Sequence, residues 1–248
     1  MRAVLLSAGQ GRRLLPLTAE TPKCALQVQE RSLLEWQIQE LAKCGVRDVT
    51  VIVGFRADKV DQILSGYEGP VRFQTVFNPF YGVSDNLASC WVARESLKGD
   101  FLLINGDTLF ESAILQTLLD TPTWPVTLLT DRKDHYDADD MKVCLDGQRL
   151  VQIGKTIPPD QAHGESIGMM AFRGEGASLF REALDQKIRQ PEALKMWYLS
   201  IIDELAQQGK VSTVSIKGAR WAEIDCHEDL LEAKKLVEYL AGAPVQFV

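Results

Sequence analysis

Two acidic positions and one cationic loop are the parts of this sequence whose residue types and spacing could carry out chemistry. Asp107 follows a buried-strand pattern, so its side chain should point into the crevice above a sheet. The alternating string at residues 221–225 places Glu223 and Asp225 on one face of a strand. Carboxylates could serve phosphoryl-type transfer by holding a divalent cation against triphosphate oxygens. For Asp107, which lies beside a glycine, a plain turn remains the alternative.

The cationic loop lies at residues 6–14 and reads Leu-Ser-Ala-Gly-Gln-Gly-Arg-Arg-Leu. Two glycines after a strand let backbone N–H groups point at a phosphate, and Arg12 and Arg13 add positive charge. A Walker loop would end in Gly-Lys-Ser/Thr, which is missing here. A dinucleotide fingerprint would need a third glycine where Leu14 stands, and an acid near residues 53–55. A plain glycine turn remains the alternative to a phosphate loop.

Hydrophobic periodicity predicts the elements that must position these residues. A capping box at Ser32 and Glu35 begins a helix that Gly45 should end. Strand patterns lie at residues 3–7, 49–53, 71–77, 101–104 and 126–130, and further helical patterns at 57–64 and 112–119. This alternation with short connections predicts a parallel, doubly wound sheet, and the continuous apolar strands predict burial on both of its faces.

The pattern changes after about Asp131. A hairpin is predicted at residues 141–153, a further strand at 165–172, and helices at 177–187, 197–208 and 228–240. The expected fold class is α/β, with a doubly wound, mostly parallel Rossmann-like sheet, added antiparallel strands and C-terminal helices. We expect residues 1–248 to form a single domain. Its nucleotide-binding half would be 1–130 and its acceptor-binding half 131–248.

Composition excludes several classes of function. The formal net charge of −7 argues against a nucleic-acid or anionic-membrane surface, because both need a basic field. No apolar run approaches the ~20 residues that a membrane-spanning helix needs. The five cysteines are scattered without a Cys-x-x-Cys motif, so neither a disulfide framework nor a zinc site is expected. A reducing cytoplasm fits this pattern.

The loop is part of a longer string, Gly-x-Gly-x-Arg-Leu-x-Pro-x-Thr followed by Thr-Pro-Lys, which ends at Lys23. This string resembles the signature of the sugar-nucleotidyltransferase superfamily of pyrophosphorylases. The resemblance implies that the loop wraps NTP phosphates and that Arg13 and Lys23 neutralise charge as pyrophosphate leaves. Residues 221–230 resemble the family's Trp-x-Glu-Ile-Asp-x-x-Glu-Asp-Leu segment. Asp107 and Asp225 are therefore implied as the two ligands of a Mg²⁺ cofactor, and together with Arg13 and Lys23 they form the expected catalytic set.

A second segment indicates the subfamily. Residues 78–89 read Asn-Pro-Phe-Tyr-Gly-Val-Ser-Asp-Asn-Leu-Ala-Ser, where sugar-1-phosphate members usually have a Gln-x-x-Gly-x-Ala-type segment. With residues 105–107, 141–143 and 221–225, this string resembles the cytidylyltransferases for phosphocholine and related small phospho-alcohols, including inositol phosphate and aminoethylphosphonate. That group usually has Asn-Asn-Leu, so Asp85 is a departure that leaves its role in base or acceptor recognition open.

Two sets of binding residues follow from the resemblance. The family places a lysine near Lys155 for the acceptor phosphate, although solvated strand lysines are the alternative for both Lys142 and Lys155. A choline-type acceptor would want an aromatic cage, but the sequence assigns no aromatic residue to one. The acceptor-binding set is Lys142, Lys155 and Glu165. The nucleotide-binding set is Leu6, Ala8, Gly9, Gly11, Arg12, Arg13, Lys23, Ser84, Asp85, Asn86 and Gly106.

The expected reaction is transfer of CMP from CTP to a small phosphorylated alcohol or phosphonate, with release of pyrophosphate. Positioning and charge neutralisation suffice for such a transfer, so no protein nucleophile is needed. One alternative is a sugar-1-phosphate nucleotidyltransferase that uses UTP, dTTP or GTP, and a second is a non-catalytic nucleotide sensor. The expected partners are CTP or another NTP and a small phosphorylated metabolite, with no nucleic acid or membrane. A homo-oligomer is left open.

Overall fold

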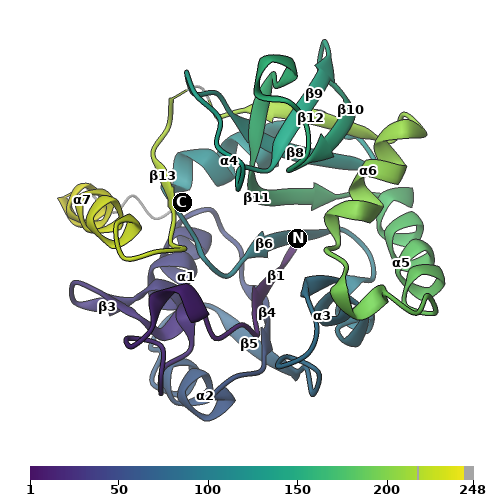
Figure 1. Ribbon diagram of the computed structural model, residues 1–248. Coiled ribbons are helices and arrows are strands. Elements are labelled where there is room, and N and C mark those ends of the chain that lie inside the picture. The colour runs from purple at the N-terminus through teal and green to yellow at the C-terminus, as the bar shows by residue number, and fades with distance from the viewer. Residues whose placement is uncertain (217, 243–248) are drawn as a thin grey trace. The chain divides into compact units, whose positions relative to one another are not determined.

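A computed structural model describes residues 1–216 and 218–242 (Figure 1). These residues form two compact units that interleave along the chain. Unit 1 comprises Met1–Gly82, Ile104–Gln116 and the described residues from Ala219 onward. Unit 2 comprises Val83–Leu103 and Thr117–Gly218. The expected division into a nucleotide-binding half, 1–130, and an acceptor-binding half, 131–248, concerns substrate binding. It stays a prediction.

The strands of unit 1 form a parallel α/β arrangement (Figure 1). Their order is β5-β4-β1-β6, and β4 pairs in parallel with both β1 and β5. The bounds are β1 Arg2–Ser7, β4 Asp48–Val53, β5 Arg72–Phe77 and β6 Phe101–Asn105, with helices α1 Leu33–Lys43 and α2 Ala57–Ser65. The β6 strand crosses from unit 2 into unit 1 at Ile104. This order brings the chain from the ends of β1 and β6 into adjacent turns, as Rossmann-like sheets do at their ligand-binding edge.

The last segment of the chain completes unit 1. Strands β7 Thr108–Phe110 and β13 Trp221–Glu223 pair antiparallel, and helix α7 spans Asp229–Gly242. A short hairpin is formed by β2 Gln27–Val28 and β3 Arg31–Ser32. One apolar cluster buries Ile224, Leu236 and Val237 with Leu33 and Trp36 of α1. Burial of these side chains fixes α7 on the part of the chain that carries the glycine-rich loop.

Unit 2 combines parallel and antiparallel strands. Their order is β6-β11-β8-β12-β10-β9, in which β12 runs parallel to β8 and β11 runs antiparallel to it. Phe101 and Phe172 stack with ring centroids 4.5 Å apart in its core. The strand bounds are β8 Val126–Asp131, β9 Lys142–Asp146, β10 Arg149–Gly154, β11 Gly164–Phe172 and β12 Val211–Ser215. The helices are α3 Asn86–Val92, α5 Glu175–Lys187 and α6 Leu199–Gln207, and α4 Ser112–Asp120 begins in unit 1.

The predicted fold class is confirmed, and most predicted elements lie within a few residues of their expected bounds. The capping box is complete, since Ser32 and Glu35 each accept a backbone N–H from the other. Some expected bounds were wrong in detail: for example, the helix expected at 197–208 begins at Leu199, and the strand expected at 221–225 ends at Glu223. Sequence patterns missed α3, β7 and β12. Within the described residues, no helix has the length and apolar character needed to cross a membrane.

Candidate active site

The glycine-rich loop of unit 1 has the backbone freedom that its sequence predicts. Gly11 has a φ of +78°, a left-handed conformation that side chains rarely adopt, and it precedes the short 3-10 helix Arg12–Leu14. A Cβ at Gly11 would also lie 3.0 Å from the Lys23 side chain. The hydroxyl of Thr18 donates to the Gly11 carbonyl at 2.8 Å, which closes the loop from its far end. Gly11 therefore lets Lys23 pass close beneath the loop.

Asp107 lies in a turn directly after β6. The Gly106 N–H donates to the Leu6 carbonyl at 3.1 Å, and a Cβ at Gly106 would lie 2.4 Å from that oxygen, so only glycine fits. Lys23 Nζ donates to Asp107 Oδ2 at 2.8 Å. The other carboxylate oxygen, Oδ1, is buried and has no hydrogen-bond partner within the described residues. A buried anionic oxygen without a donor is costly, and a ligand that binds it would remove that cost.

Asp225 reaches the same place from the far end of the chain. Lys23 Nζ also donates to Asp225 Oδ1, and Arg13 Nη2 donates to Asp225 Oδ2 at 2.6 Å. The Asp229 carboxylate accepts the N–H groups of Asp225 and Cys226, both at 2.7 Å, so the chain turns there instead of continuing β13. The structure thus brings together all four members of the expected catalytic set, Arg13, Lys23, Asp107 and Asp225.

The side chains of Lys23 and Arg13 differ in how far they are exposed to solvent. The Lys23 side chain is 14% exposed, whereas that of Arg13 is 55% exposed. Burial alone would lower the pKa of Lys23, but the Asp107 and Asp225 carboxylates outweigh it, and the pKa lies above its ordinary value. Lys23 therefore carries a permanent positive charge between two acids at neutral pH.

A third acid joins the two predicted metal ligands. Carboxylate oxygens of Asp107, Glu223 and Asp225 lie within 4.8 Å of one another. Oxygen donors of this kind suit the hard cation Mg²⁺, and the buried Asp107 Oδ1 is a free acceptor, so the residues fit such an ion. Glu223 was not predicted as a ligand. The alternation of residues 221–225 did place it beside Asp225, but its closeness to Asp107 comes from the pairing of Glu223 with Thr108.

The nucleotide-binding residues predicted at 84–86 lie in unit 2, at the start of α3. The Asp85 N–H donates to the Leu194 carbonyl at 2.7 Å, and Asn86 Oδ1 accepts from the Tyr198 N–H at 2.9 Å. The Ser84 hydroxyl is buried with no partner in the part of the chain that the structure describes. Asn86 therefore holds the segment that precedes α6, and the Asp85 side chain does not cap α3.

The three predicted acceptor-binding residues surround the loop between β8 and β9. Lys142 is only 1% exposed, and its ammonium donates to the carbonyls of Asp137 and Asp140 at 2.8 and 3.3 Å. Glu165 of β11 lies opposite Lys142 of β9 in the antiparallel pairing of these strands. Its carboxylate forms an ion pair with the Lys133 ammonium at 3.1 Å. Burial raises the pKa of Glu165, and the ion pair with Lys133 offsets part of that shift.

Lys155 differs from Lys142 in its surroundings. Its Nζ lies 4.8 Å from the ring centroid of Trp197 and 3.5 Å from Asp139 Oδ1. Trp197 is 41% exposed. The Lys155 ammonium therefore lies at a partly exposed aromatic face, and Lys155 is also the lysine near which the family resemblance places an acceptor-phosphate lysine.

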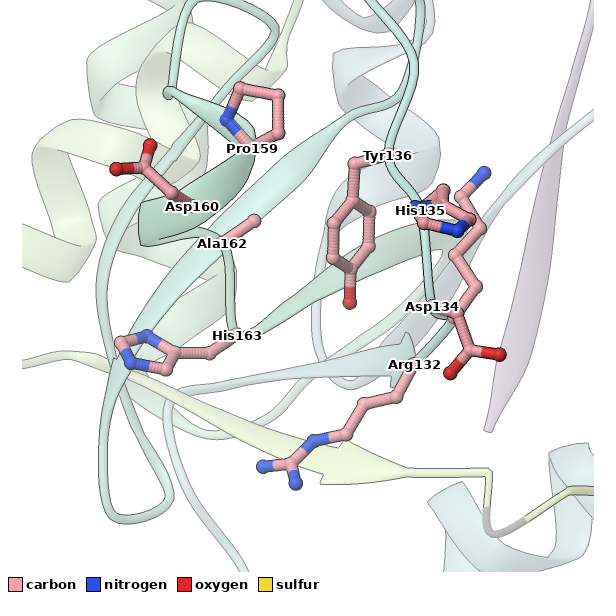
Figure 2. A pocket seen from close by; sticks show the side chains of 9 residues that line it. Arg132, Asp134, His135, Tyr136, Pro159, Asp160, Ala162 and His163 are labelled. Atoms are coloured by element: carbon pink, nitrogen blue, oxygen red, sulfur yellow. The ribbon is translucent and has the colours of Figure 1, made fainter.

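Unit 2 also has an open pocket of about 720 Å³ (Figure 2). Tyr136 lies between the two loops that form the pocket, with Ala162 and His163 on one side (Figure 2). The described residues that line it are Arg132, Lys133, Asp134, His135, Tyr136, Pro159, Asp160, Ala162 and His163. None of the three predicted acceptor-binding residues is among them.

Sequence comparison finds similar proteins among known transferases. The chain is 28% identical over 236 residues to a bifunctional IPC transferase and DIPP synthase of Aquifex aeolicus, which covers 94% of this chain and 51% of that protein. It is 33% identical over 112 residues to a choline-phosphate cytidylyltransferase of Streptococcus pneumoniae, covering 45% of this chain and 47% of that protein. The aligned region thus spans about half the length of either relative.

A solved structure has the same fold. The inositol-1-phosphate CTP transferase from T. maritima superposes with a TM-score of 0.82 at 23% identity, over 98% of this chain and 96% of that one. The family described as the MobA-like NTP transferase domain matches residues 3–212. The resemblance to nucleotidyltransferases that the sequence motifs indicate is confirmed, and the chain belongs to the MobA-like NTP transferase domain family.

Proposed function

We propose that this protein transfers CMP from CTP to a small phosphorylated alcohol or phosphonate and releases pyrophosphate. The observation that carries the proposal is the convergence of Asp107 and Asp225 on the Lys23 ammonium, beside a buried Asp107 oxygen that has no donor among the described residues. The names of the relatives, which include an IPC transferase and a choline-phosphate cytidylyltransferase, support the choice of nucleotide and acceptor class.

Asp107 and Asp225 would hold Mg²⁺, with Glu223 as a third oxygen donor, and the bound ion would supply positive charge to the triphosphate oxygens. An acceptor phosphate or phosphonate oxygen forms the new bond to the α-phosphorus of CTP. The bond from that phosphorus to the bridging oxygen breaks, and the electron pair leaves with pyrophosphate. Lys23 and Arg13 stabilise the charge that develops on the leaving group. Both are anchored to Asp225, which holds them at one point of unit 1.

Unit 2 is proposed to bind the acceptor. Lys155 is the lysine suited to contact the acceptor phosphate, because its ammonium lies beside the partly exposed Trp197 ring and is not buried. A cationic head group could take the same aromatic face by a cation–π contact. Lys142 would support the acceptor site by holding the 137–140 loop in place, because its ammonium already donates hydrogen bonds to backbone carbonyls of that loop.

A panel of nucleotides and acceptors tests the proposal. CTP, UTP, dTTP, GTP and ATP are each combined with phosphocholine, aminoethylphosphonate, inositol phosphate and several sugar 1-phosphates, and pyrophosphate release is measured. We expect CTP with one of the first three acceptors to give the highest kcat/KM. A higher value for UTP, dTTP or GTP with a sugar 1-phosphate would overturn the proposal in favour of the sugar nucleotidyltransferase alternative. Nucleotide binding without turnover would favour a sensor.

A further inference from the structure

A buried glutamine on α1 contacts the turn that carries Asp107. Gln37 is fully buried, and its Nε2 donates to the carbonyls of Asn105 at 2.8 Å and Thr108 at 2.7 Å. These two carbonyls flank Gly106 and Asp107. One side chain therefore holds both ends of the turn.

The two acceptors determine how the amide is oriented. An amide nitrogen has two N–H donors, and here each meets a backbone carbonyl, whereas a flipped amide would place its oxygen against both carbonyls. The Gln37 Oε1 is buried and has no partner within the described residues. A methionine would fill the same space without burying an unpaired oxygen, so packing alone does not account for a glutamine at this position.

Two backbone hydrogen bonds also join this turn to neighbouring segments. Gly106 N–H donates to the Leu6 carbonyl, and Ile224 N–H donates to the Asp107 carbonyl, each at 3.1 Å. The first joins the turn to β1, and the second joins it to the residue before Asp225. In addition to these two backbone hydrogen bonds, Gln37 supplies a side-chain hydrogen bond to each end of the turn.

We propose that Gln37 is a positioning residue for the metal centre: it fixes the rotation of the Asn105–Thr108 turn so that the Asp107 carboxylate faces Asp225. This inference rests on the proposed function, because it requires a divalent cation at Asp107. Removal of a group that hydrogen-bonds to a metal ligand and orients it commonly lowers metal affinity by about 10- to 100-fold. Loss of the two hydrogen bonds should therefore weaken metal binding before it affects binding of the acceptor.

The same helix offers a matched control. Glu40 lies one turn after Gln37, is also fully buried, and accepts from the Ser112 N–H at 2.9 Å and from Lys43 Nζ at 2.7 Å. None of these contacts involves the Asp107 turn. Glu40→Gln thus perturbs a buried polar contact of α1 without acting on the metal centre.

The experiment measures binding of Mn²⁺ alone to the full chain by electron paramagnetic resonance, with folding checked by circular dichroism. Gln37→Met should raise the Kd for Mn²⁺ at least about tenfold, and Glu40→Gln should change it less than twofold. In pyrophosphate release, Gln37→Met should raise the KM for Mg²⁺ while the acceptor KM at saturating Mg²⁺ stays within about twofold.

Three results would overturn the inference. If wild type and Gln37→Met bind Mn²⁺ with equal affinity, Gln37 does not position the metal centre. The same conclusion follows if Gln37→Met and Glu40→Gln lose equal affinity for Mn²⁺. Neither result would contradict the metal centre itself. No Mn²⁺ binding by wild type would instead overturn the metal centre of the proposed function, and this inference with it. If Gln37→Met does not fold, Gln37→Asn is measured against the same control, since its shorter amide cannot reach both carbonyls.

Discussion

Each unit of this protein buries a lysine next to acidic residues, yet the two lysines are held in different ways. Lys23 of unit 1 contacts the side chains of Asp107 and Asp225, and one oxygen of Asp107 still has no donor among the described residues. The hydrogen bonds of the Lys142 ammonium to described residues go to the backbone carbonyls of Asp137 and Asp140. Side-chain carboxylates can exchange one cation for another, whereas backbone carbonyls hold a loop in shape. The partners of a lysine, more than its burial, indicate whether it can take part in chemistry.

Removal of the metal should have the largest effect on the rate of pyrophosphate release. It tests whether the reaction takes place at the Lys23 cluster. EDTA should lower pyrophosphate release at least about a hundredfold, because a divalent cation supplies several kcal/mol of charge stabilisation. Added Mg²⁺ should restore the rate. Asp107→Asn should abolish this metal dependence, while Asp140→Asn, which alters the acid that pairs with Lys133 in unit 2, should retain it. Full turnover in EDTA would remove the metal from the mechanism.

Lys23→Ala should reduce kcat by about 100- to 1,000-fold, the usual cost of losing one group that stabilises charge in the transition state. The unfolding temperature, measured with Mg²⁺ present, should change by only a few degrees. Lys59→Ala is the control, because Lys59 Nζ donates to the Thr21 hydroxyl at 3.2 Å in the same loop without contacting Asp107 or Asp225. Near-normal kcat in Lys23→Ala would contradict the role of this lysine.

Lys142→Met should show the opposite pattern. The variant removes the two hydrogen bonds from the buried ammonium to the Asp137 and Asp140 carbonyls, so the free energy of unfolding should fall by ~1–3 kcal/mol. We expect kcat to change less than in Lys23→Ala. Denaturant unfolding and pyrophosphate release are compared with those of Lys187→Met, whose lysine is also buried but pairs with the Glu204 carboxylate. A large loss of turnover at unchanged stability would end the distinction between the two lysines.

Asp85→Asn should give the smallest effect and tests whether unit 2 contacts the base. A carboxylate accepts from the cytosine amino group and repels the uracil oxygen, so the variant should narrow the CTP-over-UTP preference by up to about tenfold. The acceptor KM should stay constant. A raised acceptor KM with an unchanged nucleotide preference would assign Asp85 to a cationic acceptor instead. No change in either quantity would make it a solvated loop residue.

Local signals explain what the sequence could predict. The capping box at Ser32 and Glu35 needs only four consecutive residues, and the structure has it in full. The glycine loop and the two aspartates of the proposed metal centre could be predicted from motifs, because each motif is continuous in sequence. The strand β7 has only three residues, and β12 reads Val-Ser-Thr-Val-Ser, which has neither an apolar run nor a regular alternation, so both were missed.

Contacts between distant segments explain what the sequence could not predict. Lys142 begins β9 and Lys155 directly follows β10 of the same hairpin, but only the fold of the 137–140 loop shows which ammonium is buried. Glu223 enters the metal centre through its pairing with Thr108. Gln37 contacts a turn that lies 68 residues further along the chain, and no local pattern reports such a contact.

The interleaving of the two units has a consequence for synthesis of the protein. Ribosomes would translate residues 117–218 of unit 2 after Asp107 and before Asp225. A nascent chain that ends within that stretch already carries the glycine loop, Lys23 and Asp107, but it lacks the acid that completes the metal centre. Asp225 can pair with Lys23 and Arg13 only after residues 219–225 have been translated. If the proposed function holds, a chain that stops before Asp225 should release no pyrophosphate.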